Sequence, residues 1–122
     1  MKKILIIDDD ELILMTCRNL LAKEGFQVFE AANGNLGIEL YKNEKPDLVI
    51  TDILMPDKEG LETISELRAI NPACKIIAMS SGGSTQNMSF LQLAKQLGAD
   101  RALQKPIKPA EMLQAVKGLM NT

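Results

Sequence analysis

The sequence predicts an α/β domain in which a parallel sheet is covered by helices on both faces. Three short, unbroken apolar runs, Ile4–Ile7, Leu48–Ile50 and Ile76–Met79, are typical of strands that are buried on both faces. Segments with the apolar spacing of helices lie between these runs. With two weaker strands, the pattern alternates five strands and five helices along 122 residues, the size of one domain with a parallel sheet.

In the first half of the chain, helical segments follow strands and are ended by residues that stop helices. A helix is expected over Glu11–Glu24, with Gly25 as its stop. Its apolar residues recur on one side: Ile13, Cys17, Leu20 and Leu21. A second strand is expected over Phe26–Glu30, and a second helix near Leu36–Tyr41 has to end before Pro46.

The second half repeats this alternation. A third helix is expected over Leu61–Ile70 and is ended by Pro72, and a fourth is expected over Phe90–Leu97. Ala102–Gln104 is a weak fifth strand, and Pro109 opens a last helix at a position where proline is tolerated. The last helix is expected to face the core with Met112, Val116 and Leu119. Right-handed crossovers follow from the general handedness of such connections, whereas the strand order does not follow from the pattern.

Composition and charge exclude several classes of function. The net charge is −2, the pI is about 5.2 and no basic run is present, so the chain lacks the electrostatic footprint of direct nucleic-acid binding. No apolar stretch reaches the ~18–20 residues of a membrane span, and the first apolar run is too short for a signal peptide, so we expect a cytoplasmic protein. The chain has no histidine, which removes Ser-His-Asp chemistry and His-ligated metals. Cys17 and Cys74 indicate neither a disulfide framework nor a zinc site, and Cys17 is expected in the core.

Polar side chains lie just past the carboxyl ends of four predicted strands. They are the run Asp8-Asp9-Asp10, then Asp52, Ser80 and Lys105. In open α/β sheets, ligands bind outside these carboxyl ends. Taken singly, Asp10 is expected to cap the following helix, Ser80 to form a turn and Lys105 to be solvated. The coincidence of all four at one edge of the sheet indicates a site.

These residues stand in a pattern that resembles the receiver domain of two-component response regulators, over essentially the whole chain. The matching pieces are Ile6–Asp10, Pro46–Pro56 with Gly60, Met79-Ser80, Gly98–Asp100 and Lys105-Pro106. The resemblance implies a flavodoxin-like, doubly wound sheet of order 2-1-3-4-5 with five helices. It also implies one receiver domain over residues 1–122, of the stand-alone type without an output domain, and a cis bond before Pro106.

By the same resemblance, Asp52 is the acceptor of a phosphoryl group from a phosphohistidine on a sensor histidine kinase or phosphotransfer protein. Lys105 would pair with the acyl phosphate, and the hydroxyl of Ser80 would donate to a phosphoryl oxygen. The chain would then control a downstream target protein, with the fourth helix, fifth strand and fifth helix as the partner surface. It would phosphorylate and dephosphorylate only itself and would not be an enzyme in the usual sense.

The resemblance also implies bound Mg²⁺. Asp9 and Asp52 would bind it directly, the backbone carbonyl of Leu54 would be a third ligand, and Asp8 would act through water. Three aspartates carry a formal charge of −3, which Mg²⁺ and Lys105 together would neutralise.

The sequence departs from the common receiver pattern in two places. Ala102 stands where many receivers have Tyr or Phe, so an aromatic relay of the signal is in doubt. The segment from Ser80 to Asn87 is longer than usual and rich in Gly and Ser, and we hypothesise that it transmits the signal instead.

Three other functions remain open at this stage. The chain could be a phosphorelay shuttle that passes the group to a His-phosphotransfer protein. It could be a Mg²⁺-dependent phosphohydrolase with an aspartyl nucleophile, although Leu54 stands where such an enzyme needs its second acid. It could also be a degenerate receiver, which the intact acidic run, Ser80 and Lys105 argue against.

Overall fold

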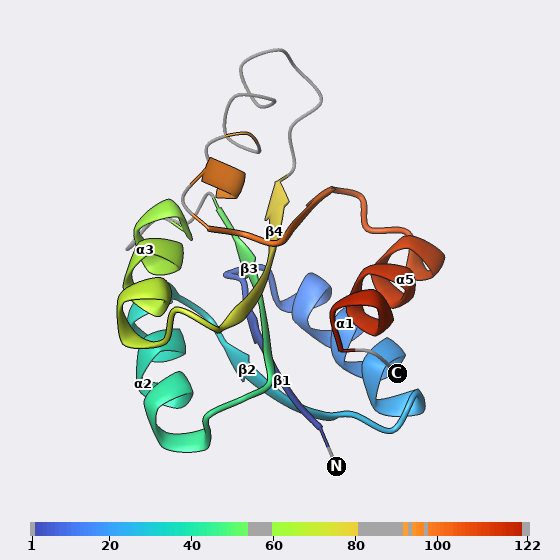
Figure 1. The fold of residues 1–122 in the computed structure, drawn as a ribbon. Coiled ribbons are helices and arrows are strands. Elements are labelled where there is room, and N and C mark those ends of the chain that lie inside the picture. The colour runs from blue at the N-terminus through green and yellow to red at the C-terminus, as the bar shows by residue number, and fades with distance from the viewer. Residues whose placement is uncertain (1, 54–59, 81–91, 93, 97, 121–122) are drawn as a thin grey trace.

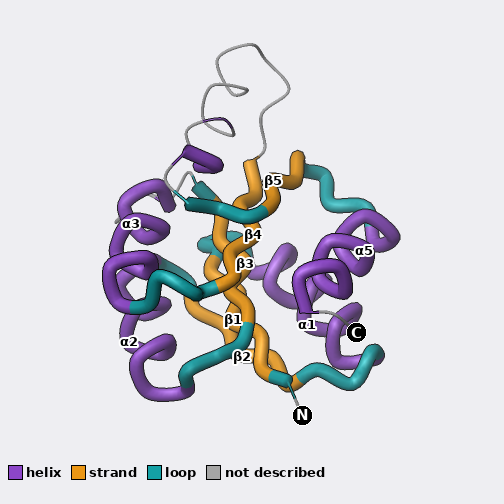
Figure 2. The backbone as a smooth tube through the Cα atoms, viewed as in Figure 1, coloured by secondary structure: helices purple, strands orange, loops and turns teal. Residues whose placement is uncertain are grey.

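The computed structural model describes residues 2–53, 60–80, 92, 94–96 and 98–120. Its centre is a five-stranded sheet whose strands lie in the order β2-β1-β3-β4-β5 (Figure 2). Every neighbouring pair of strands is parallel. The strands are β1 (Lys3–Ile7), β2 (Gln27–Ala31), β3 (Leu48–Asp52), β4 (Lys75–Ser80) and β5 (Arg101–Gln104). This order confirms the predicted fold class and places β1 beside β3.

Helices cover both faces of the sheet. The described helices are α1 (Glu11–Lys23), α2 (Gly34–Glu44), α3 (Gly60–Ile70) and α5 (Pro109–Met120). In Figure 1, α2 and α3 lie on one side of the sheet, and α1 and α5 lie on the other. Residues 92 and 94–96 are helical, within the predicted helix Phe90–Leu97; the rest of that helix lies outside the described residues.

The strands separate two hydrophobic cores. Alternate residues of β1 point to opposite faces: Leu5 and Ile7 pack with α2 and α3, whereas Ile4 and Ile6 pack with α1 and α5. All four side chains are fully buried, as the unbroken apolar runs predict for a sheet covered twice. Cys17 is 1% exposed, which confirms it as a core residue.

Several predicted boundaries need correction. β2 begins at Gln27, because the N–H of Phe26 donates to the carbonyl of Leu21 at the end of α1. Phe26 is buried under α1 and therefore has the apolar character of a strand residue without being one. The buried side of α1 is formed by Leu14, Cys17 and Leu21, whereas Ile13 and Leu20 are only partly buried.

The last helix begins at Pro109, as predicted. Met112 and Val116 are fully buried, whereas Leu119 is partly buried at the margin of the same core. Among the described residues, no helix combines the length and apolar character needed to cross a membrane.

Candidate functional site

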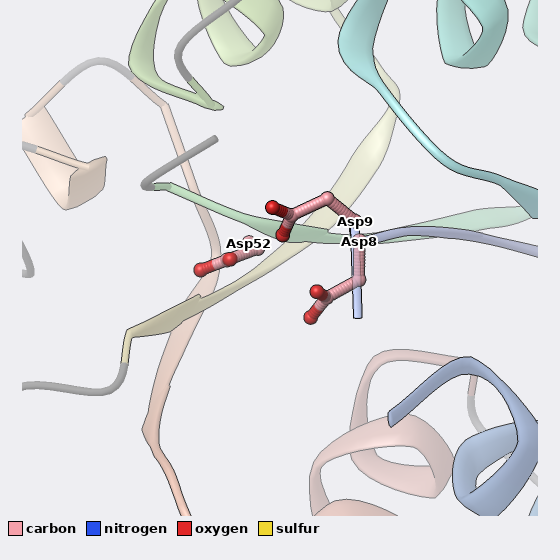
Figure 3. A group of neighbouring side chains, drawn as sticks. All are labelled: Asp8, Asp9 and Asp52. Atoms are coloured by element: carbon pink, nitrogen blue, oxygen red, sulfur yellow. The ribbon is translucent and has the colours of Figure 1, made fainter. Parts of the chain in front are cut away.

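Three aspartates converge at the carboxyl edge of the sheet. Asp8 and Asp9 directly follow β1, and Asp52 is the last residue of the neighbouring strand β3. One carboxylate oxygen from each lies within 4.8 Å of the other two (Figure 3). Asp8 and Asp52 are buried, whereas Asp9 is exposed. The convergence expected from the sequence is therefore present.

Asp8 is fixed by both its backbone and its side chain. Its N–H donates to the carbonyl of Ala31 at the end of β2, at 3.0 Å. Its Oδ1 accepts from the N–H of Asp10 at 2.9 Å, and its Oδ2 accepts from the ammonium of Lys105 at 2.8 Å. Asp10 in turn caps α1 by accepting from the N–H of Leu12, as predicted. The acidic run therefore contains one carboxylate for the helix and two for the site.

Lys105 reaches the site from beyond β5. Its N–H donates to the carbonyl of Ser80 at 2.6 Å, and the bond to Pro106 is cis, as the resemblance implied. Its ammonium lies 2.8 Å from Oδ2 of Asp8 and 3.4 Å from Oδ2 of Asp52, with 13% of the side chain exposed. The lysine therefore bridges the two buried carboxylates.

Burial and pairing act against each other on these groups. Burial raises the pKa of Asp8, and the hydrogen bond from Lys105 opposes that rise. Burial disfavours the charged form of Lys105, but its hydrogen bond to Asp8 and the charges of Asp52 and Asp8 outweigh this effect and raise its pKa. Three ionised carboxylates and one ammonium sum to a formal charge of −2, which a divalent cation would neutralise.

The backbone of Asp52 is held by groups that the sequence analysis did not single out. The hydroxyl of Thr51 donates to the carbonyl of Asp52 at 3.0 Å. The N–H of Ile53 donates to the carbonyl of Met79 in β4 at 3.0 Å. The available signal was a threonine between the apolar run Leu48–Ile50 and Asp52, because the hydroxyl of the fully buried Thr51 needs a partner.

Ser80 lies at the same edge of the sheet. It is the last residue of β4, is fully buried and follows Met79, which is the register partner of Asp52. The structure therefore brings together five of the six predicted site residues. The sixth, Leu54, lies outside the described residues, as do residues 81–87 of the segment Ser80–Asn87 that we expected to transmit the signal.

The acidic cluster fits the chemistry of Mg²⁺. Its donors are all oxygens, supplied by three carboxylates on two adjacent strand ends. Mg²⁺ is bound in proteins by a few carboxylates and keeps several waters. The exposed Asp9 leaves one side of the cluster open to solvent.

Comparison with known proteins identifies the family. The protein-family model described as "Response regulator receiver domain" matches residues 4–117 of the chain. The chain belongs to the response regulator receiver domain family. The chemotaxis protein CheY of Thermotoga maritima is 36% identical over 116 residues, which cover 94% of each chain. The sporulation initiation phosphotransferase F of Bacillus subtilis is 34% identical over 116 residues, 95% of this chain and 91% of the relative.

Solved structures agree with this assignment. A CheY-like receiver domain from Methanospirillum hungatei JF-1 superposes with a TM-score of 0.90 at 32% identity, covering 99% of this chain and 94% of that one. A CheX-CheY-BeF3-Mg complex from Borrelia burgdorferi matches with a TM-score of 0.89 at 27% identity, covering 98% of this chain and 89% of that one. Receiver domains bind Mg²⁺ and are signalling proteins that are generally not enzymes. This receiver is thus a phosphorylation-dependent signalling switch of two-component systems.

Proposed function

We propose that Asp52 is the phosphoacceptor of this receiver. A carboxylate oxygen of Asp52 attacks the phosphorus of a phosphohistidine on a partner kinase, the P–N bond breaks, and the imidazole nitrogen keeps the electron pair. The product is an acyl phosphate on Asp52. The observation that carries this proposal is the convergence of Asp8, Asp9 and Asp52 around the Lys105 ammonium. The missing histidine is supplied by the partner, since this chain has none.

Lys105 and Ser80 would act on the phosphoryl group. The ammonium already lies 3.4 Å from the Asp52 carboxylate, so it is placed to pair with an added phosphoryl oxygen. Ser80 would donate its hydroxyl to another phosphoryl oxygen and pull the following segment inward. Asp9 and Asp52 would bind Mg²⁺ directly, Asp8 through water, and the carbonyl of Leu54 would complete the protein ligands. The metal would supply charge neutralisation for the transferring group.

The partners follow from this chemistry. A sensor histidine kinase or phosphotransfer protein would donate the phosphoryl group, and a downstream protein would read the phosphorylated state. We place the protein in the cytoplasm, where such kinases present their phosphohistidine. A stand-alone receiver is supported by the relatives from Thermotoga maritima and Bacillus subtilis, of whose own lengths 94% and 91% are matched.

A relay role is a second candidate. One relative is named a sporulation initiation phosphotransferase, which favours passage of the group from Asp52 to a histidine on another protein. Hydrolysis of small phosphate monoesters is less supported, because Leu54 stands where a second catalytic acid would be needed.

Transfer and capture experiments test the proposal. A phosphorylated kinase should label the wild-type protein and leave Asp52→Asn unlabelled, while Glu39→Gln, an exposed acid on α2, is labelled normally. Loss of label to an added His-phosphotransfer domain would favour the relay role. Capture of a target only with the phosphoryl mimic beryllofluoride would favour the effector role. Normal labelling of Asp52→Asn would refute Asp52 as the acceptor.

A further inference from the structure

We infer that Gly60 is a positioning residue for Asp52, and this inference rests on the proposed role of Asp52 as phosphoacceptor. Gly60 is the first residue of α3, and its lack of a side chain lets this helix begin directly against the backbone at the end of β3. Glycine is not needed at position 60 for its conformational freedom, because Gly60 adopts a helical backbone conformation that any residue can adopt.

The contact at Gly60 is with main chain. A Cβ at this position would lie 2.0 Å from the carbonyl oxygen of Asp52 and 2.4 Å from the Cα of Ile53. Both distances are far below van der Waals contact, and neither atom belongs to a flexible side chain. Backbone in a close-packed interior yields only by shifting the whole segment. Any side chain at position 60 would therefore displace the peptide that follows the phosphoacceptor.

This peptide cannot move without consequences for the site, because it is held from several sides. The N–H of Ile53 donates to Met79, and the carbonyl of Ile53 accepts from the N–H of Gly60 at 3.1 Å. The hydroxyl of Thr51 donates to the Asp52 carbonyl. A displacement of the Asp52 backbone would therefore change the 3.4 Å approach of its carboxylate to Lys105 and its distance to the other two aspartates.

Other helical glycines provide matched controls. A Cβ at Gly37 in α2 would meet Ile7 at 2.4 Å, but all three nearest atoms belong to the flexible Ile7 side chain. A Cβ at Gly118 in α5 would meet only Arg101 Nη2, at an ordinary 3.6 Å. Gly37→Ala thus tests overpacking of a core, and Gly118→Ala tests glycine replacement in a helix without a clash. Only Gly60→Ala presses on the phosphoacceptor backbone.

The experiment measures labelling by acetyl phosphate, as the rate constant per folded molecule, over a range of Mg²⁺ concentrations. We expect Gly60→Ala to lower the maximal rate constant by about 10- to 100-fold, since misplacement of reacting groups by ~1 Å costs up to about 100-fold. We also expect it to need more Mg²⁺ for half-maximal labelling, because Asp52 moves relative to Asp9. Gly37→Ala and Gly118→Ala should label like the wild type once the rates are corrected for the folded fraction.

Each outcome decides the inference. Because Gly118→Ala replaces a helix glycine with alanine, it should stabilise α5, so Gly60→Ala is also made in that background to keep it folded. Wild-type labelling by folded Gly60→Ala would overturn the inference, and so would an equal loss in Gly37→Ala. Failure of Gly60→Ala to fold even in the stabilised background would also overturn it, because Gly60 would then serve the fold as a whole. An unlabelled wild-type protein would instead refute the proposed function.

Discussion

Replacement of Asp9 by asparagine should stabilise the metal-free protein and remove its response to Mg²⁺. Asp9 is the exposed member of the acidic cluster, so its substitution leaves the buried pairing of Asp8 with Lys105 in place. The change removes one negative charge from a cluster of three and keeps the size and shape of the side chain. The wild-type cluster is therefore held together at a cost to stability that a bound cation would offset.

The magnitude follows from the distances in the cluster. Two unit charges 4.8 Å apart repel by about 0.9 kcal/mol at the dielectric constant of water and by about 3.5 kcal/mol at an effective value of 20. Asp9→Asn removes two such repulsions, one with Asp8 and one with Asp52. Asp9 is exposed, which favours the lower figure for each, and Lys105 already offsets part of the charge of Asp8 and Asp52. We therefore expect Asp9→Asn to gain about 1–2 kcal/mol in the free energy of unfolding, or roughly 3–8 °C in Tm for a domain of this size.

The assay is thermal unfolding in chelator and in millimolar Mg²⁺. The wild-type protein should gain stability with Mg²⁺, by about 2.7 kcal/mol when the ion is at 100 times its Kd. Asp9→Asn should gain far less, because it has lost a direct ligand. Glu39→Gln, which removes a negative charge from the exposed surface of α2, serves as the control. It should change neither the stability in chelator nor the gain in stability with Mg²⁺. An Asp9→Asn variant that is no more stable in chelator, yet responds fully to Mg²⁺, would refute this view of the cluster.

Two further predictions concern buried groups. Lys105→Met should lower the free energy of unfolding in chelator by about 2–4 kcal/mol, because it leaves the fully buried Asp8 without its partner; a loss below about 0.5 kcal/mol in urea unfolding, the usual size for surface changes, would contradict this. Burial, aided by the charge of Asp8, raises the pKa of Cys17 from 9.0 to about 11, so the folded state keeps a proton that the unfolded state loses. Stability should therefore fall between about pH 9 and pH 11, by about 2–3 kcal/mol from this group alone at about 1.4 kcal/mol per pKa unit; Cys17→Ala should show a shallower loss in urea unfolding over this range, and an unchanged slope would contradict the assignment.

The sheet was predictable because burial on both faces leaves a clear mark on a strand. Unbroken apolar runs located β1, β3 and β4, and the polar residues at their carboxyl ends, aspartates after β1 and at the end of β3 and Ser80 at the end of β4, pointed to the site. The prediction placed β2 one residue early, because the apolar side chain of Phe26 packs into the core beneath α1 although Phe26 is not part of the strand. The strand order came only from family resemblance, because local pattern carries no information about which strands are neighbours.

Long-range pairings were beyond the reach of the sequence. The family resemblance implied that Lys105 faces the phosphoryl group, but the sequence does not reveal that its ammonium donates to Asp8, 97 residues away, in the unmodified protein. The motif Gly98–Asp100 matched the family without a visible reason. In the structure, Arg68 of α3 donates to the carbonyl of Gly98 at 3.0 Å and to the carboxylate of Asp100 at 3.0 Å. Gly98 has a φ of +122°, which favours glycine, and a Cβ there would lie 2.6 Å from Nε of Arg68, so any other residue would also displace this side chain.

The most direct test of the account is to map where acetyl phosphate places its phosphoryl group. The wild-type protein is incubated with acetyl phosphate, with Mg²⁺ or with chelator, and the modified peptide is identified by mass spectrometry beside that of Asp52→Asn. We predict a single acyl phosphate on Asp52 that forms only with Mg²⁺ and is absent from Asp52→Asn. Labelling of Asp52→Asn at another residue, at the rate seen for the wild type, would contradict the account. Labelling of the wild type in chelator to the same extent as in Mg²⁺ would also contradict it.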